Sequence, residues 1–199
     1  MFSKSFSDFI HCFSQLPGIG QKSSERIAFF LLKQSNSFVE KLSNSIINLK
    51  QKSHFCSICG NISDTEPCQI CTDRNRDNEV ICVVENPFDI YVIESTNSYN
   101  GLYHSIGGVI SPLNGITPEN LNIDSLIKRI NNNKIKEIIF ALSSTTEGDA
   151  TALYIKDLLK NKNITFSHLA RGIPIGTSIM YAGVKSISEA IKGREKIID

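Results

Sequence analysis

The chain has 199 residues, a length that accommodates one or two compact domains. It carries 21 basic and 20 acidic side chains, and this near-balance excludes histone-like or tail-driven binding to nucleic acid through a large cationic excess. The hydrophobic fraction of 41% is enough for a packed core and excludes wholesale disorder. The chain starts without the apolar stretch of a signal peptide, and no run approaches the roughly 18 apolar residues of a membrane span. We therefore expect a soluble, cytoplasmic protein with no membrane segment.

Local charge differs along the chain. Residues 1–55 hold seven basic and three acidic side chains, a net charge of +4, whereas residues 56–79 hold two basic and five acidic ones, a net charge of −3. Residues 80–199 hold twelve of each kind. If the protein has a basic face, we therefore expect it in the N-terminal part.

The N-terminal part has the periodicity of helices. Apolar side chains recur at spacings of three and four over residues 2–16, and again over residues 27–31 and 38–49, so three helices are predicted. Ser37 and Glu40 form a capping-box pattern, which predicts that the third helix begins at Ser37.

A glycine motif separates the first two predicted helices. Residues 16–23 read Leu-Pro-Gly-Ile-Gly-Gln-Lys-Ser, in which Gly18 and Gly20 permit a tight turn with exposed backbone N–H groups. The second helix then begins with its positive dipole end, which favours a phosphate. Lys22 and Arg26 are four residues apart, so they project from one face just beyond the turn. The motif is typical of a helix-hairpin-helix element that grips the DNA backbone; an ordinary helix–helix turn with two solvated cations is the alternative.

Four of the six cysteines form two closely spaced pairs. Cys56 and Cys59 make the first pair, Cys68 and Cys71 make the second, and eight residues separate the two pairs. Two such knuckles supply four thiolates for a tetrahedral site, and structural zinc is the metal that this ligand set favours. An iron–sulfur cluster and four unrelated buried thiols are the alternatives.

Strands alternate with helices beyond the cysteines. Val80–Val84 is a continuous apolar run typical of a strand buried on both faces. Cys82 within this run, and Cys12 on the apolar side of the first helix, are expected in the core. The elements predicted next are a helix at 124–131, a strand at 137–142, a helix at 150–160 and a strand at 164–169. This order favours a parallel α/β sheet. Residues 99–118 are expected to be loop or irregular strand, and Ser186 is expected to cap one last short helix.

Acidic side chains follow two of the predicted strands. Glu85 comes directly after the buried run, and Glu147 and Asp149 follow the strand at 137–142. Because open α/β sheets place functional groups at the carboxyl ends of their strands, we expect these three carboxylates near one another. They could share a Mg²⁺ ion, which prefers oxygen ligands, or they could simply cap a helix.

Taken together, these features resemble the RecR family of bacterial recombination mediators. The resemblance runs in order through the glycine motif with Arg26, the four cysteines and the segments 73–77, 81–85, 99–104, 107–108, 111–113, 147–151 and 170–174. It implies an α/β fold class with four regions. These are a helix-hairpin-helix DNA-binding region at residues 1–54, a four-cysteine zinc finger at 55–78, a Toprim domain with a parallel sheet at 79–174, and a short C-terminal helical, oligomerisation region at 175–199.

The resemblance also implies a function. RecR-like proteins act with RecO and RecF, helping RecA to replace single-strand-binding protein on gapped DNA, and they assemble as dimers to ring-like tetramers. It implies sequence-independent DNA binding through Gly18, Gly20, Lys22 and Arg26, one structural zinc ion per chain, and a location at the nucleoid. We expect no enzymatic activity.

The alternative is a Mg²⁺-dependent Toprim nuclease or primase-like enzyme. Such enzymes pair a strand-end glutamate, here Glu85, with an Asp-x-Asp-x-x-Gly segment, for which this chain has Glu and Ala at the first and last positions of residues 147–152. Metal-assisted phosphoryl chemistry also needs a nucleophile or an activated water, and none is evident. His104 could act as a base, although a structural or surface histidine is the plainer interpretation.

The chain departs from the family pattern in three places. The family usually has Thr-Gly where this chain has Asn97 after a threonine, which still permits a turn because asparagine tolerates a positive φ. Asp149 replaces a glutamate of the family and keeps the charge. Met180 and Gly183 stand where the family tends to have acids, so we make no prediction about nucleotide binding.

Overall fold

The computed structural model describes residues 2–194, and the chain divides into two compact units with the boundary in the sequence between Ser53 and His54. Each unit is described by itself. No helix within the described residues is both long enough and apolar enough to cross a membrane.

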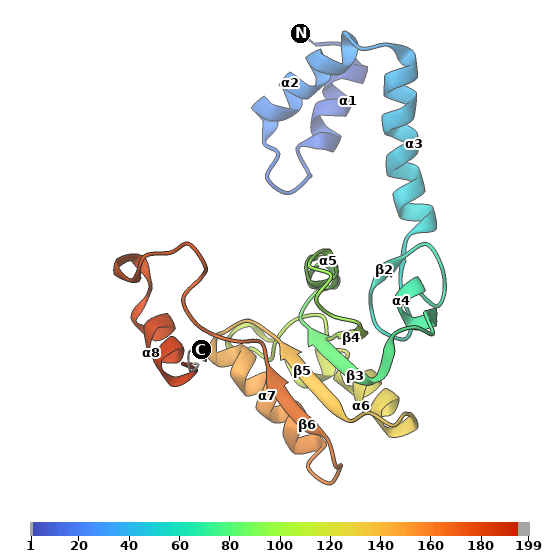
Figure 1. The fold of residues 1–199 in the computed structure, drawn as a ribbon. Helices are drawn as coiled ribbons and strands as arrows, with labels where there is room; N and C mark the ends of the chain where they lie inside the picture. Colours follow the sequence, from blue (N-terminus) through green and yellow to red (C-terminus); the bar gives the residue numbers. More distant parts are fainter. Residues whose placement is uncertain (1, 195–199) are drawn as a thin grey trace. The chain divides into compact units, whose positions relative to one another are not determined.

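Residues 2–53 fold into the three expected helices (Figure 1). They are α1 (Lys4–Phe13), α2 (Gln21–Leu32) and α3 (Asn36–Lys52). Phe6 of α1 packs against Phe29 of α2 with ring centroids 5.0 Å apart, so the aromatic stripe of the first helix does join these two helices.

Two expectations for this unit are wrong. The third helix begins at Asn36, and its N-cap is Ser35, whose hydroxyl accepts a hydrogen bond from the Phe38 N–H at 3.3 Å. The predicted cap, Ser37, therefore lies inside the helix. Cys12 is exposed, because it lies two residues, or about 200° around the helix, from the buried Ile10.

The second unit begins with a small finger. Its elements are β1 (His54–Phe55), β2 (Ile62–Ser63) and the single helical turn α4 (Gln69–Thr72). The two strands pair antiparallel and hold a tight loop between them.

A parallel four-stranded sheet follows the finger (Figure 1). Its strands are β3 (Asp77–Val84), β4 (Gly101–Ser105), β5 (Glu137–Ala141) and β6 (Thr165–His168), in the order β4-β3-β5-β6. The helices of this unit are α5 (Pro87–Ser95), α6 (Ile123–Asn132), α7 (Thr146–Leu158) and α8 (Val184–Lys192), with short 3-10 turns at Pro112–Asn114, Pro118–Asn120 and Ile179–Tyr181. The expected α/β class, with a helical N-terminal unit and a helical C-terminal segment, is confirmed.

The core lies on both faces of β3. Ile81 and Val83 pack on one face with residues of α6 and α7, whereas Cys82 and Val84 pack on the other face with Ile90 of α5. Alternate strand residues point to opposite faces, so a strand covered on both sides needs the unbroken apolar run that the sequence has here. Full burial of each such side chain contributes about 1.5–3 kcal/mol.

Several element boundaries differ from those expected. β4 lies inside the segment 99–118 that was expected to be loop or irregular strand, and α5 was not predicted. α7 begins at Thr146 and not at Ala150, because Thr145 caps it by accepting a hydrogen bond from the Gly148 N–H. The last helix has Gly183 as its N-cap, so Ser186 lies inside α8 and does not cap it.

Candidate zinc site and nucleic-acid interface

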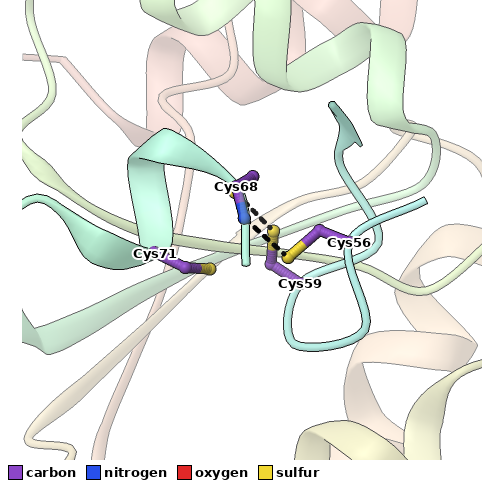
Figure 2. Close-up of side chains that lie close together, drawn as sticks. All are labelled: Cys56, Cys59, Cys68 and Cys71. Atoms are coloured by element: carbon purple, nitrogen blue, oxygen red, sulfur yellow. Dashed lines mark hydrogen bonds between the residues drawn. The ribbon is translucent and has the colours of Figure 1, made fainter. Parts of the chain in front are cut away.

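The four clustered cysteines converge on one point between the finger loop and α4 (Figure 2). Their sulfur atoms all lie within 4.8 Å of one another, and the Cys59 and Cys68 sulfurs are 3.5 Å apart. Cys56, Cys59 and Cys68 are buried, and Cys71 is half-buried. Within the described residues, no other group of three or more Cys, His, Asp or Glu side chains is placed to share an ion.

The loop that carries the first two cysteines is held by its own backbone. The Gly60 N–H donates to the Cys56 carbonyl at 2.8 Å, and the Cys56 N–H donates to the Asn61 carbonyl at 2.7 Å. Gly60 has a φ of +74°, which a residue with a side chain rarely adopts. Cys68 then caps α4, and its N–H donates to the Cys56 sulfur at 3.4 Å, so the second pair of cysteines is tied to the first.

Burial and hydrogen bonds change the pKa values of three of these thiols. Burial raises the pKa of Cys56, but backbone N–H groups, including that of Cys68, outweigh burial and lower it to about 7. The hydrogen bond with Cys71, followed by burial, raises the pKa of Cys59, and burial raises that of Cys68 to about 11. The raised pKa values of Cys59 and Cys68 favour the protonated thiols in the absence of a cation, and a divalent cation would favour their thiolate forms. The donor set, its burial and its spacing fit a closed structural zinc ion.

The glycine motif forms the turn expected between the first two helices. Gly18 has a φ of +76°, and the Ile19 N–H donates to the Leu16 carbonyl at 3.1 Å. Gly20 is the N-cap of α2, and apart from the chain neighbours of each glycine, no described residue lies within 4 Å of the position of a Cβ atom at Gly18 or at Gly20. The turn is therefore open on its outer side, where bare backbone N–H groups can meet a phosphate.

Lys22 and Arg26 lie on the helix that follows this turn. Both side chains are exposed, in the first and second turns of α2. Their spacing of four residues puts them about 40° apart around the helix axis. Both lie near the N-terminal end of the helix, which is the positive end of its dipole. The sequence thus placed both cations on one exposed face.

The three acidic residues follow β3 and β5, and two of them, Glu85 and Asp149, have partners within the protein. Glu85 follows β3, and its carboxylate accepts a hydrogen bond from the Ser143 N–H at 2.5 Å. Glu147 and Asp149 lie in the first turn of α7, and Asp149 pairs with Arg171 at 2.6 Å. The hydrogen bond from Arg171 lowers the pKa of Asp149, so this carboxylate is ionised at neutral pH.

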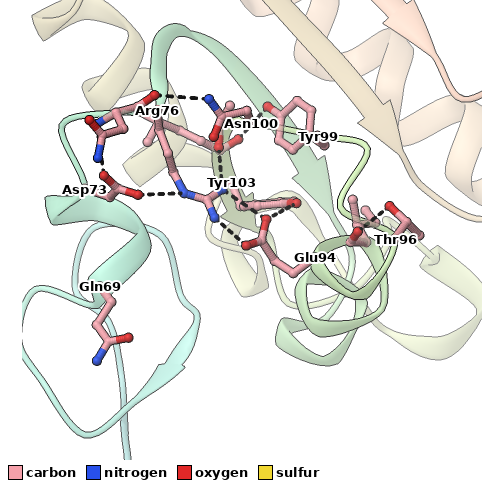
Figure 3. Close-up of polar contacts among 12 residues, drawn as sticks. Gln69, Asp73, Arg76, Glu94, Thr96, Tyr99, Asn100 and Tyr103 are labelled. Atoms are coloured by element: carbon pink, nitrogen blue, oxygen red, sulfur yellow. Dashed lines mark hydrogen bonds and ion pairs between the residues drawn. The ribbon is translucent and has the colours of Figure 1, made fainter.

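A polar network that sequence reasoning missed joins the finger to the sheet (Figure 3). Arg76 donates through both terminal nitrogens to Glu94 of α5 and donates to the Gly101 carbonyl at 3.0 Å. The Tyr103 hydroxyl donates to Glu94 at 2.7 Å, and Asp73 lies 3.9 Å from Arg76. Only 12% of the Arg76 side chain is exposed. The arginines of the segment 73–77 were noted in the sequence, but nothing in a linear pattern pairs Arg76 with Glu94, 18 residues away.

His104 is a core residue. It is 1% exposed on β4, and its Nε2 lies 3.0 Å from the Asn122 carbonyl, which accepts its proton. Its Nδ1 is buried and has no hydrogen-bond partner among the described residues. Burial lowers the pKa of His104 to about 4, so the ring is neutral at pH 7 and is not placed to act on a ligand at the surface.

This burial makes fold stability depend on pH. An unfolded His104 takes up a proton near its ordinary pKa of 6.5, whereas the folded one does so only near pH 4. The free energy of unfolding should therefore fall as the pH drops from 6.5 to 4, by up to about 3 kcal/mol. Urea unfolding at pH 7 and pH 5, with zinc content measured at both, should show this loss. His104→Gln should reduce the loss, and an equal loss in that variant would contradict the assignment.

A helix-hairpin-helix turn, a four-cysteine finger and a parallel sheet with acidic strand ends define a zinc-finger protein of the Toprim class. The comparisons with known proteins agree. Family models for the RecR helix-hairpin-helix, for the RecR zinc finger domain with four cysteines, and for the Toprim domain match residues 6–50, 54–73 and 79–170.

Named relatives match nearly the whole chain. "Recombination protein RecR" of Enterococcus faecalis is 44% identical over 188 residues, which cover 94% of this chain and 95% of the relative. The protein of the same name from Desulforudis audaxviator is 42% identical and covers 98% of this chain and 99% of its own length. That of Bacteroides thetaiotaomicron is 47% identical, over 92% of this chain and 89% of its own length. The chain belongs to the RecR family of recombination proteins.

Proposed function

We propose that the protein is a non-catalytic, DNA-binding mediator of recombinational repair. In this role it acts with RecO and RecF to help load RecA on gapped or single-stranded DNA, in the cytoplasm at the nucleoid. The observation that carries the proposal is the succession of the three family matches in one chain whose relatives, along nearly their full length, are named recombination protein RecR.

The zinc finger has a structural role in this proposal. Cys56, Cys59, Cys68 and Cys71 hold one zinc ion per chain in a closed site with four protein ligands. A closed site leaves no position for a substrate, so the ion supports folding and takes no part in a reaction.

DNA is held at the N-terminal turn. The backbone at Gly18 and Gly20 meets a phosphate, and Lys22 and Arg26 contact neighbouring phosphates. Support comes from the open outer side of the turn, the exposure of both cations and the net charge of +4 over residues 1–55. Contacts of this kind are to the backbone and do not read bases, so binding is independent of sequence.

Lys22→Ala combined with Arg26→Ala should weaken binding to all DNA sequences alike. Each lost phosphate contact should reduce the salt slope of the binding constant by about 0.9 for a duplex and about 0.7 for a single strand. Fluorescence anisotropy at several salt concentrations measures this slope. Lys33→Ala with Lys41→Ala, which removes two cations outside the turn, is the matched control. An unchanged affinity and slope in the first variant would contradict the assignment.

The strand-end acids serve recognition of a partner. We assign Glu85, Glu147 and Asp149 to the docking of a basic surface on RecO. Glu85 and Ser143 join the ends of β3 and β5, and α7 presents the other two acids at the same edge of the sheet. Charge complementarity of this kind sets specificity and association rate, so added salt weakens the complex.

Glu147→Ala combined with Asp149→Ala should reduce the association rate with RecO and leave zinc content and thermal unfolding close to those of the parent protein. Asp124→Ala with Asp157→Ala, which removes two exposed acids elsewhere in this unit, should have a smaller effect. Surface plasmon resonance at two salt concentrations makes the comparison. Equal binding by the parent and the first variant would refute the docking role.

The enzymatic alternative is disfavoured by what the carboxylates contact. Glu85 accepts a hydrogen bond from a backbone N–H and Asp149 pairs with a guanidinium, so each of these carboxylates already has a protein partner where a metal ligand needs a free oxygen atom. His104, which the sequence analysis named as a candidate base, is buried and neutral. Cleavage or priming that requires Mg²⁺ and is lost in the Glu147→Ala, Asp149→Ala variant, with RecO binding intact, would establish the alternative.

The N-terminal unit needs a partner surface to cover its apolar side chains. Within residues 2–53 only Ile10 and Ala28 are buried apolar residues, while Leu32 is 72% exposed and Leu49 is 67% exposed. Exposed apolar surface on this scale is typical of an interface between protein chains. We therefore propose a homo-oligomer, from a dimer to a ring-like tetramer, and native mass spectrometry with and without gapped DNA determines its state.

A further inference from the structure

One edge of the parallel sheet is formed by β4, which pairs only with β3 among the described strands. The Ile106 N–H, just beyond the strand, donates to the Val84 carbonyl of β3. Because the backbone groups of alternate residues face opposite sides of a strand, Gly101, Tyr103 and Ser105 face away from the sheet. Such outward backbone groups are a template on which another chain can add a strand.

In this protein each of these three residues has a backbone group that is already bonded. The Gly101 carbonyl accepts from Arg76 at 3.0 Å, and the Tyr103 carbonyl accepts from Arg129 of α6 at 2.6 Å. The Ser105 N–H donates to the Cys59 carbonyl at 2.8 Å. Two guanidinium groups and one finger carbonyl thus take the places of a neighbouring strand.

All three partners are connected to the cysteine site. Cys59 is one of the four cysteines, and the second terminal nitrogen of Arg129 lies 4.0 Å from the Cys71 sulfur. Arg76 closely follows α4 and lies 3.9 Å from Asp73 at the end of that turn. The finger loop also lies against the strand, because a side-chain carbon at Gly60 would be 3.2 Å from the Ser105 carbonyl oxygen.

We propose that the zinc finger is a metal-dependent cap on the open edge of the sheet. With zinc bound, the loop that carries Cys59 and the Arg129 guanidinium are fixed, and the outward side of β4 is covered. Loss of the metal releases both groups and uncovers β4, while the two core clusters around β3, which contain none of the three buried finger cysteines, stay packed.

Residue-resolved hydrogen exchange on the full chain tests the cap, because neighbouring amides face opposite ways. The Ser105 N–H depends on the finger, whereas the Ile106 N–H depends on β3. After zinc is removed with the chelator TPEN, exchange at Ser105 should become about tenfold faster or more, and exchange at Ile106 should change far less. Equal loss of protection at both amides, or no change at Ser105, would overturn the proposal.

Arg129→Gln tests the same cap with zinc bound. Groups that orient metal ligands typically change metal affinity by about 10- to 100-fold, so zinc transfer to a competing chelator should become faster by a similar factor. Exchange at Ser105 should rise in the same variant. Lys128→Gln, at an exposed position of the same helix, is the control and should behave as the parent does. Parental zinc transfer and parental Ser105 protection in Arg129→Gln would overturn the proposal.

Discussion

Replacing Cys59 with serine is expected to strip the protein of zinc and to unfold the finger. Cys59 is fully buried and its sulfur lies within the cluster, 3.5 Å from that of Cys68. The finger has two strands of two residues and one helical turn, which is too little structure to be stable without the ion. The variant forfeits most of the apparent free energy of zinc binding, about 10–16 kcal/mol for structural sites of this kind.

Zinc content measured by atomic emission, together with the midpoint of thermal unfolding, checks this prediction. Both should fall in Cys59→Ser. Cys12→Ser is the matched control, because Cys12 is exposed and lies outside the cluster, so zinc content and midpoint should stay at parental values. Well-folded parent protein that contains no zinc, or a Cys59→Ser variant that keeps a full zinc equivalent, would contradict the assignment of these ligands.

Replacing Arg76 with methionine is expected to destabilise the second unit by about 3–5 kcal/mol, the usual cost of breaking a largely buried ion pair. The variant removes both bonds to Glu94 and the bond to the Gly101 carbonyl, and it leaves the Glu94 carboxylate with the Tyr103 hydroxyl as its remaining partner in the network. Arg76 is the cation in these contacts, and it connects the end of α4 with α5 and β4.

Urea unfolding of the full chain measures this loss, and Arg74→Met, an exposed neighbour, is the control. The pH dependence adds a second readout. The bond from Arg76 lowers the folded pKa of Glu94, so the pair stabilises the fold above the ordinary pKa of 4.5 and ceases to do so as the pH falls through the folded pKa. In Arg76→Met, the part of the unfolding free energy that this pair loses on acidification should be absent at every pH. A variant as stable as Arg74→Met at neutral pH would show that the network contributes nothing.

The parts of the molecule that the sequence predicted well are set by a few neighbouring residues. The spacing of the cysteines, the turn at Gly18 and the buried run of β3 each follow from local chemistry, and the structure has all three. Asn97, which stands where the family usually has glycine, adopts the expected positive φ, +52°, in the turn after α5.

The parts that were missed depend on residues distant in the sequence. α5 is apolar on the side that faces the sheet, at Ile90, and also on its exposed side, at Phe88 and Tyr91, so it has no helical stripe to detect. β4 is recognisable as a strand only once β3 lies beside it and the finger covers its other edge. The contact between Arg129 and the Cys71 sulfur could not be predicted from the sequence either, because the two residues are 58 positions apart.

The loading of RecA is a direct test of the proposed role as a mediator. Gapped DNA coated with single-strand-binding protein is mixed with RecA and RecO, with and without this protein, and RecA filament formation is followed through its ATP hydrolysis. We expect this protein to shorten the lag before hydrolysis only when RecO is present, and the Lys22→Ala, Arg26→Ala variant to do so less well. An unchanged lag with zinc-loaded parent protein and RecO would contradict the proposed role as a mediator.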